Sequence, residues 1–392
     1  MLKTYEYRLY PNKAQKVQIA KQFGCCRFVY NKALALRKET YELKKEYLSK
    51  YDLITEITKW KGQEEFSWLK ESHSQVLQQA VFDMDTAYQR FFREKTGFPK
   101  FKSKKTHRYA FRYSQGCKID NEKNKIFLPK LGWVNCVIDR PIEFKLRSVT
   151  VKQVPSGKYF VCCLFDDGQE LHPKKPIKEE TTVGIDLGLK DFAVLSNGTK
   201  IPRMRFIKQY EKQLAKLQKR HSRKQIGSHN REKARIKVAR LQEKIANCRK
   251  DYLHKVSHKI INENQVDTIC LETLNVAGMM KNHRLAKAFA DVGMYMFKRM
   301  LEYKADRAGK NILYIGQFEP STKLCDCGFK NDNLTLADRE WTCPKCGRHY
   351  DRDIHAAENI KKFALSEHNL TCYNTRLGKS VELVELLALV KA

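Results

Sequence analysis

Three acidic residues in the C-terminal half of the chain have the chemistry and the setting of metal ligands. Asp186 follows the apolar run VGI, Glu272 follows the run TICL, and Asp353 opens the segment DIHAAENI. A carboxylate at the end of a buried strand carries a desolvation cost unless a metal ion or hydrogen bonds compensate for it. If the three segments converge, we expect the carboxylates to form a site for divalent cations.

Strand-forming segments are predicted to position the first two acids. Residues 183–186 have the pattern of a short strand, Gly188 permits a turn, and residues 192–195 complete a hairpin. Asp186 is therefore expected near the centre of a sheet. Residues 266–271 form another β-rich run, which places Glu272 at a strand end.

A helix is predicted to position the third acid. Apolar residues recur every three or four positions from Ile354 to Ala364, so Asp353 opens this helix on its buried side. Asp351 is a competing candidate, but it precedes the helical face. Any one of these acids alone could equally be an ordinary strand-end or helix-cap residue, and only the set indicates a shared site.

The expected cofactor of such a site is Mg²⁺, because magnesium prefers carboxylate oxygens and keeps several waters for exchange with substrate phosphate. Two such ions, for which Mn²⁺ could substitute, can activate an attacking water and stabilise the leaving oxygen when they lie about 4 Å apart. The set Asp186, Glu272 and Asp353 is therefore typical of a nuclease or polymerase site.

A second metal site is predicted from four of the thirteen cysteines. Cys325 and Cys327 form a C-x-C pair, and Cys343 and Cys346 form the C-x-x-C pair of WTCPKCG. This spacing is close to that of a zinc ribbon with tetrahedral thiolate ligands, although the first pair is one residue shorter than the usual C-x-x-C. His349 is a possible substitute ligand. Most of the other cysteines are expected to be small buried hydrophobes, since an odd number does not suggest a disulfide framework.

The charge of the chain indicates a polyanionic partner. The 392 residues carry a net charge of +32, and nucleic acid is the obvious polyanion. Residues 200–255 contain 19 basic and 4 acidic residues on two predicted helices, separated by a breaker-rich stretch at 221–230. We expect phosphate contacts from this region, including those of Arg231, Lys233, Arg235 and Lys237.

A membrane surface is the other polyanion to consider. The sequence has no run of about 20 apolar residues and no recognisable secretory signal, so a cytoplasmic protein without membrane contact is expected.

The first 180 residues predict a β-barrel with a helical insertion. Residues 1–10 have strand character, residues 13–95 have helical spacing, and five short β-like runs follow between residues 110 and 165. Residues 172–180 contain two prolines and several charges, as expected of a linker.

Two further groups in this part are candidates for nucleic-acid contact. The basic and aromatic stretch 98–113 could bind a phosphate backbone through Lys100, Lys102, Lys104 and Lys105 and stack bases on its rings, although a barrel strand would show the same pattern. Gln78 and Gln79 lie on a predicted helix and could present their amides to adenine edges, or they could be ordinary surface residues.

Taken together, the order of the motifs resembles that of the transposon-encoded TnpB (OrfB) nucleases, RNA-guided relatives of type V CRISPR effectors. The similarity covers nearly the whole chain, in YRLYPNKAQ, FGCCRFVYNKAL, SQVLQQA, FPKFKSKK, GIDLGLKDFAVLSNG, LETLNVAGMMKN and the cysteine ribbon leading into DRDIHAAENI. One departure is His355, where the family more often has Asn, and we expect it to tune the site without abolishing activity.

The resemblance implies an α+β multidomain fold. Its expected parts are a β-barrel wedge domain (1–10 and 97–172), an inserted helical recognition domain (11–96), a linker (173–180), a RuvC-like, RNase H-type α/β nuclease domain (181–320 and 350–365), a zinc-ribbon insertion (321–349) and a C-terminal tail (366–392). We have no functional interpretation of the tail, in which residues 380–392 could form an amphipathic helix.

The resemblance also implies an activity. Asp186, Glu272 and Asp353 would be the catalytic, metal-binding triad of an endonuclease that carries a guide RNA derived from the transposon end. The expected substrate is double-stranded DNA beside a short flanking motif, cut on both strands by one site, so that the transposon is retained, and the expected assembly is a monomer. A non-cleaving RNA-guided repressor is the alternative, which the intact acids disfavour. A strand-joining transposase would need an end-recognition module, and none is evident.

Overall fold

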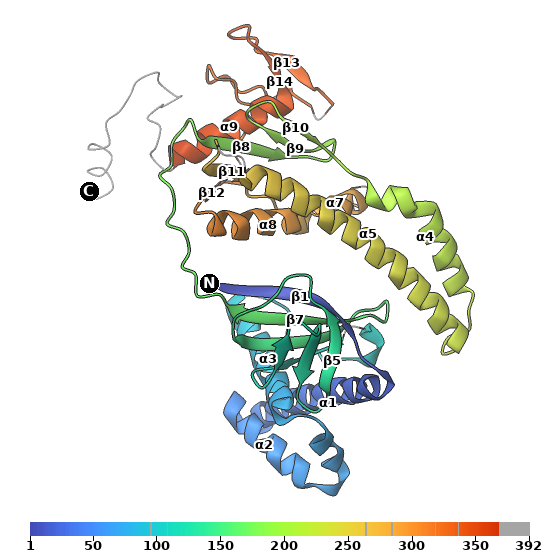
Figure 1. Cartoon of the computed structure of the whole chain (residues 1–392). Helices are drawn as coiled ribbons and strands as arrows, with labels where there is room; N and C mark the ends of the chain where they lie inside the picture. The colour runs from blue at the N-terminus through green and yellow to red at the C-terminus, as the bar shows by residue number, and fades with distance from the viewer. Residues whose placement is uncertain are drawn as a thin grey trace. The chain divides into compact units, whose positions relative to one another are not determined.

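The computed structural model describes residues 1–94, 96–107, 109–262, 265–283, 285–317, 319–335 and 337–367 (Figure 1). The predicted tail helix at 380–392 lies outside the described residues. The chain divides into two compact units, one made of residues 1–170 and 225–240 and the other of residues 171–224 and 241–392. Each unit is built around its own sheet, and each is described here by itself.

The first unit contains a seven-stranded antiparallel sheet in the order β2-β6-β7-β1-β5-β4-β3. Its strands are β1 (Leu2–Tyr10), β2 (Tyr109–Tyr113), β3 (Lys118–Asp120), β4 (Lys125–Leu128), β5 (Gly132–Val137), β6 (Leu146–Gln153) and β7 (Tyr159–Asp166). The N-terminal strand is central because it pairs with both β5 and β7. Among the described residues the hydrogen-bonded order runs from β2 to β3, and the β-barrel expected from the sequence stays a prediction.

Helices inserted between β1 and β2 complete the first unit, as the sequence predicted. They are α1 (Lys13–Lys44), α2 (Lys50–Gly62), η1 (Glu64–Glu71) and α3 (Ser74–Glu94), followed by the single turn η2 (Lys104–Thr106). Asn12 and Gln15 cap the start of α1 reciprocally, which satisfies backbone donors that a helix end leaves open. Phe23 of α1 packs on Tyr109 and Phe111 of β2, so helices and sheet share one core.

The second unit contains a mixed five-stranded sheet in the order β10-β9-β8-β11-β12. Its strands are β8 (Thr182–Leu187), β9 (Asp191–Leu195), β10 (Lys200–Pro202), β11 (Thr268–Glu272) and β12 (Asn311–Ile315). The hairpin β8–β9 is antiparallel, whereas β8, β11 and β12 run parallel. The sequence predicted β8, β9 and β11 but not the edge strands β10 and β12.

Helices cover both faces of this second sheet (Figure 1). The helices of this part of the chain are α4 (Phe206–Ser222), α5 (His229–Asn262), α6 (Val276–Met279), α7 (Ala286–Val292), α8 (Met294–Arg307) and α9 (Arg352–Glu367). Of these, α4 packs against α5 and, among the described residues, not against the sheet. On one face Ile185 and Leu271 pack with Leu253 of α5 and Phe297 of α8. On the other face Cys270 packs with Ile360 of α9.

The contact between β8 and α9 is unusually close because Gly184 has no side chain. A Cβ atom at Gly184 would lie 1.9 Å from the carbonyl oxygen of Ala357 and 2.8 Å from the backbone nitrogen of Lys361. Both neighbours are backbone atoms, so no side-chain movement could relieve the clash. Glycine at this position therefore lets α9 lie directly on the central strand.

Two smaller features complete the second unit. A two-stranded ribbon, β13 (Glu340–Thr342) and β14 (His349–Asp351), precedes α9. The segment expected to be a linker is held by ion pairs of Lys174 with Asp306 and of Lys175 with Asp267. Among the described helices, none is long and apolar enough to span a membrane.

Candidate metal centres and nucleic-acid interface

Asp186 and Glu272 lie side by side at the ends of two neighbouring strands. Ile185 of β8 is paired with Leu271 of β11 in a parallel ladder, and each acid is the next residue of its strand. Parallel strands in register end at the same edge of the sheet. The strand ends predicted from sequence thus become adjacent.

The two carboxylates also project from the same face of the sheet, the face covered by α9. Side chains alternate along a strand, so residues two positions apart share a face. Gly184 contacts α9 and lies two residues before Asp186, and Cys270 packs against α9 two residues before Glu272. Asp353 lies in the first turn of α9. The three predicted acids therefore converge at one edge of one face.

The pKa of Asp186 reflects its burial and the nearby acids. Burial, followed by repulsion from Glu272 and Asp353, raises the pKa of Asp186 to about 7, while Arg352 acts in the opposite direction. Such a rise is the expected response when burial and neighbouring carboxylates outweigh the nearby cations. Carboxylate oxygens are the ligand type that hard divalent ions prefer, although the oxygens of these acids are not gathered as closely as the cysteine sulfurs described below.

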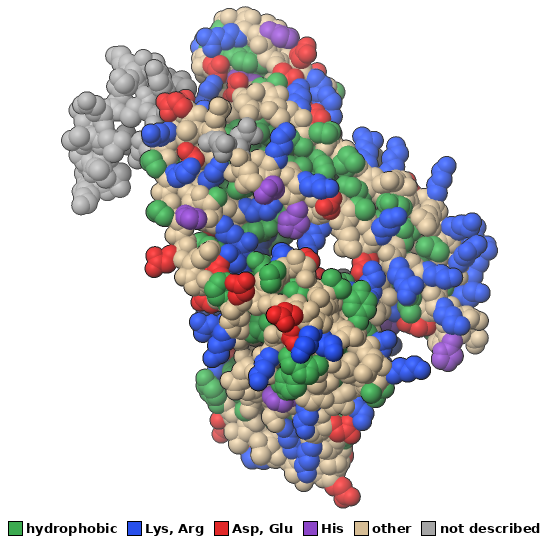
Figure 2. Space-filling view, viewed as in Figure 1, with side chains coloured by type: hydrophobic (Ala, Val, Ile, Leu, Met, Phe, Trp, Pro, Cys, Tyr) green, Lys and Arg blue, Asp and Glu red, His purple; other side chains and the backbone are tan. Residues whose placement is uncertain are grey.

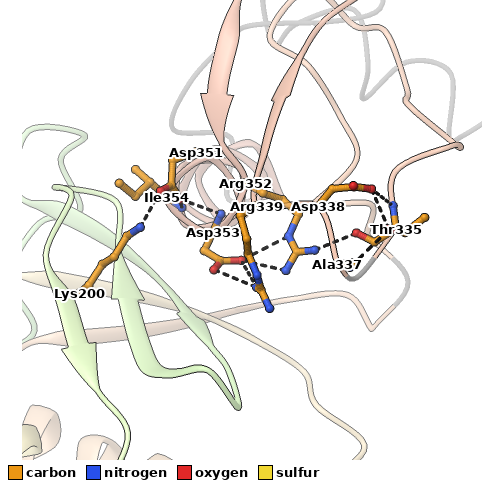
Figure 3. A network of polar contacts seen from close by, with 9 residues as sticks. All are labelled: Lys200, Thr335, Ala337, Asp338, Arg339, Asp351, Arg352, Asp353 and Ile354. Atoms are coloured by element: carbon orange, nitrogen blue, oxygen red, sulfur yellow. Dashed lines mark hydrogen bonds and ion pairs between the residues drawn. The ribbon is translucent and has the colours of Figure 1, made fainter.

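Two arginines contact the Asp353 carboxylate (Figure 3). Arg352 is buried and approaches Oδ1 at 3.0 Å, and Arg339 approaches Oδ2 at 3.3 Å. Arg352 also donates to the carbonyl oxygen of Thr335. The sequence analysis singled out neither arginine. Arg339 lies fourteen positions before Asp353, and only the fold brings it to the acid.

Asp351, the competing acid, has a different role. Its Oδ1 accepts hydrogen bonds from the backbone nitrogens of Asp353 and Ile354, and its carboxylate pairs with Lys200 of β10 (Figure 3). Burial acts to raise the pKa of Asp351. The hydrogen bond from Lys200 and those from the two backbone nitrogens outweigh burial, so the pKa of Asp351 lies below its usual value. Asp351 thus caps α9 and orients its first turn.

Glu272 has a polar partner that the sequence did not suggest. The hydroxyl of Ser321, a buried side chain, donates to Glu272 Oε1. The carbonyl oxygen of Ser321 in turn accepts from the side-chain amide of Asn359 on α9. This path of hydrogen bonds fixes the segment that leads into the ribbon against the acid.

The four ribbon cysteines form a compact group. Their sulfur atoms all lie within 4.8 Å of one another, with Cys325 to Cys346 at 3.5 Å and Cys327 to Cys343 at 3.7 Å. Tetrahedral zinc with bonds of about 2.3 Å requires sulfur atoms about 3.8 Å apart. The shortened C-x-C pair is therefore compatible with a four-sulfur site. Among the described residues, no other group of three or more His, Cys, Asp or Glu side chains has its potential ligand atoms this close together.

Two histidines beside the ribbon have other partners. His349 contacts Thr342 and Glu340, outside the sulfur group. His355 is buried, bonds to the carbonyl oxygen of Leu324 through Nε2 at 2.8 Å, and stacks on Tyr350. His355 therefore fastens α9 to the ribbon, which gives a structural reason for its presence beside Asp353.

Comparisons with known proteins indicate the family to which the chain belongs. The family OrfB_IS605, described as "Probable transposase", matches residues 160–283, a helix-turn-helix family matches residues 1–46, and the Cas12f1-like TNB domain matches residues 295–360. A Streptomyces pristinaespiralis protein named "Putative RNA-guided DNA endonuclease" is 36% identical over 362 residues, covering 91% of this chain and 88% of that protein. The Escherichia coli K12 protein "Putative RNA-guided DNA endonuclease InsQ" is 33% identical, covering 92% and 91%. The chain belongs to the OrfB (TnpB) family.

A solved structure shares the fold of this OrfB-family protein. The Cas12f1 chain of a complex with sgRNA and target DNA aligns with a TM-score of 0.57 and 14% identity, covering 92% of this chain and 98% of that one. The multidomain α+β fold is therefore the one expected for the family. The segment that matches the helix-turn-helix family does not contain two helices joined by a turn. Residues 1–46 instead contain the strand β1 and the long helix α1.

The basic region of this OrfB protein forms the helices α4 and α5, and Lys and Arg side chains crowd their surface (Figure 2). Lys233 and Lys237 are exposed. Arg235 is different, because it pairs with Glu232 through two nitrogens and donates to the carbonyl oxygen of Pro155. Arg235 therefore has a structural role that its place in a basic run did not reveal.

The other predicted contact residues lie in the first unit. Gln78 and Gln79 are half-buried on α3. Lys100, Lys102, Lys104 and Lys105 are exposed beside α1, with Lys102 Nζ 4.0 Å from the centre of the Tyr30 ring. Their surroundings are compatible with binding a polyanion.

Proposed function

We propose that this OrfB-family protein is an RNA-guided DNA endonuclease that uses a transposon-derived guide RNA and cuts both strands of a target beside a short flanking motif, which would favour retention of the transposon. The observation that carries the proposal is the convergence of Asp186, Glu272 and Asp353 at one sheet edge. The relatives named above are described as RNA-guided DNA endonucleases, which supports the same reaction class.

Asp186, Glu272 and Asp353 would hold Mg²⁺, in a RuvC-like arrangement with no covalent enzyme intermediate. Bound magnesium supplies an activated water and charge stabilisation for the leaving oxygen. The chain's own part is to position the ligands: Ser321 orients Glu272, and Asp351 orients the first turn of α9 that carries Asp353.

The ribbon cysteines Cys325, Cys327, Cys343 and Cys346 would hold Zn²⁺ in a structural site, since a four-thiolate set leaves no open position for a substrate. His355 and Asn359 bind the carbonyl oxygen of Leu324, the residue before Cys325. A zinc site there would stabilise the segment that presents Ser321 and Arg339 to the acids.

Domain roles follow from the same proposal. The sheet and helices of residues 1–170 would form the wedge and recognition parts, and the sheet of residues 181–320 with α9 would form the RuvC-like nuclease, with the zinc ribbon inserted before α9. Gln78, Gln79 and the exposed lysines of residues 100–105 would contact nucleic acid near the flanking motif. The α4 and α5 lysines would contact phosphates.

One experiment tests the proposed activity. The protein is purified with its RNA, the RNA is sequenced, and the complex is challenged with a matching target beside a randomised flanking library in Mg²⁺. We expect a transposon-end RNA and double-strand breaks beside one enriched motif. Motif-specific binding without breaks would instead favour the non-cleaving repressor, and absence of a bound RNA would contradict guidance.

A further inference from the structure

A groove in the first unit has features that the proposed function does not use. It has a volume of about 880 Å³ and runs along α1, with η1 and the segment around Phe101 as its walls. This volume lies in the range of roughly 300–1,000 Å³ that is usual for ligand sites. Gly24 leaves the floor open, since a Cβ atom there would meet no atom within 4 Å.

Two cations of this groove, Arg27 and Lys32, lack anionic partners among the described residues. Arg27 is half-buried and also lines a neighbouring cavity of about 370 Å³, yet among the described residues it has no hydrogen bond or ion pair. Lys32 is half-buried with its Nζ 3.7 Å from the centre of the Phe66 ring and 5.4 Å from that of Trp60, and no carboxylate pairs with it in the described part of the chain. Half-buried charges without counterions favour an anionic ligand.

Aromatic faces are available beside these cations. Trp68 is 39% exposed and Phe101 is 58% exposed, and both line the groove. The segment that carries Phe101 is held in place by Asn31, whose side chain bonds to both the backbone nitrogen and the carbonyl oxygen of Lys102. Exposed rings next to cations are typical of sites that stack unpaired bases and bind their phosphates.

We propose that this groove binds an unpaired stretch of RNA, with bases stacked on Trp68 and Phe101 and phosphates paired with Arg27 and Lys32. A duplex fits less well, since its bases already stack on one another. Glu71 also lines the groove and pairs with Lys21 at 2.7 Å. Its carboxylate would repel a phosphate but accept a hydrogen bond from a ribose 2′-hydroxyl, which DNA lacks. The inference rests on the proposed function in one respect, that the protein carries RNA.

The test uses full-length protein stripped of nucleic acid, in EDTA and without target DNA, so that cleavage plays no part. The probe is a single-stranded 12-nucleotide RNA containing 2-aminopurine, whose fluorescence falls on stacking, compared across a salt series with the same sequence as DNA and as a duplex. We expect tighter binding of the single-stranded RNA, with quenching. Trp68→Ala and Phe101→Ala should each weaken it by about tenfold and reduce quenching.

Matched variants separate the groove from the general positive charge of the chain. Phe92→Ala removes an exposed ring on α3 and should leave affinity and quenching unchanged. Arg27→Gln should reduce the slope of log affinity against log salt concentration by about 0.7, as expected for one lost phosphate contact to a single strand. Arg93→Gln, at an exposed site on α3, should leave this slope unchanged. Glu71→Ala should reduce the preference for RNA over DNA.

Several results would overturn the proposal. These are equal affinity for RNA and DNA, equal affinity for the duplex, or unchanged quenching in both aromatic variants. If Trp68→Ala fails to fold, ultraviolet cross-linking of the unaltered protein to the RNA decides, with adducts expected at Trp68 or Phe101 and their absence counting against the groove. Failure of the proposed endonuclease activity would show separately, as loss of target breaks with groove binding intact.

Discussion

The Ser321 hydroxyl donates a hydrogen bond to the Glu272 carboxylate, and this contact joins two parts of the second unit that lie 49 residues apart in sequence. Ser321 is only 4% exposed, and its own carbonyl oxygen is held by Asn359. Glu272 is therefore fixed by the segment that leads into the ribbon as well as by its strand.

Ser321→Ala is expected to slow cleavage by about tenfold or more, because a hydrogen bond to a charged group contributes about 1.5–3 kcal/mol and Glu272 would lose its orientation. RNA and target binding should not change. Single-turnover cleavage rates would measure the effect, with Ser366→Ala as a control, since the Ser366 hydroxyl donates to the carbonyl oxygen of Phe363 near the end of α9 and, among the described residues, contacts neither acid. Equal rates in the two variants would show that Ser321 does not position the acid.

Asp186→Asn should abolish magnesium-dependent cleavage while leaving RNA and target binding largely intact. The same substitution should raise the melting temperature in EDTA. Burial and the neighbouring acids raise the pKa of Asp186 to about 7 in the fold, well above the ordinary value of a carboxyl group. Ionisation therefore costs stability as the pH rises toward 7, and an uncharged amide avoids this cost. Cleavage and thermal melting would be measured on the same preparation. Substantial cleavage by this variant would contradict the triad.

Zinc should be present at about one ion per chain, and Cys343→Ser should lower both the zinc content and the melting temperature. Cys248→Ser is the matched control, because Cys248 is half-buried on α5 and outside the sulfur group. Elemental analysis with thermal melting checks both. Active protein free of zinc would show that the sulfur group is merely reduced cysteine.

The double variant Lys233→Gln/Lys237→Gln should weaken nucleic-acid binding uniformly and flatten its salt dependence, by about 0.9 for each lost contact to duplex phosphate. Preference for the flanking motif should remain. Lys123→Gln/Lys145→Gln removes the same charge from exposed positions elsewhere and serves as the control. Loss of motif preference at an unchanged salt slope would mean that these lysines contact bases.

The sequence predicted the acids and their strands because the signals are local. A carboxylate after VGI or TICL is visible without knowledge of the fold, and so is the helical period after Asp353. The hairpin β8–β9 formed as expected, and β11 formed where a strand was predicted, but its parallel pairing with β8 was not predicted. The β-barrel stays a prediction, because closure depends on a pairing between distant edge strands that alternation alone does not specify.

The partners of the acids could not be predicted in the same way. Ser321 and Arg339 are ordinary residues in the sequence, and only tertiary packing makes them partners of Glu272 and Asp353. The same holds for Asn359, which bonds to the carbonyl oxygen of Ser321. Arg235 was predicted to contact phosphate because it lies in a basic run, but in the structure its guanidinium group is already paired with Glu232. Charge and spacing identify candidate groups, but they do not reveal which are already bound.

Gly184 has a consequence for how decayed copies of such a gene can be recognised. A chain that keeps all three acids but carries alanine at this position would force α9 away from β8, because the obstructing atoms belong to the backbone. The distance between Asp186 and Asp353 would change although neither ligand was altered. A search for the three acids alone would then classify an inactive copy as intact. The residue two positions before Asp186 indicates in addition whether the spacing between the acids is preserved.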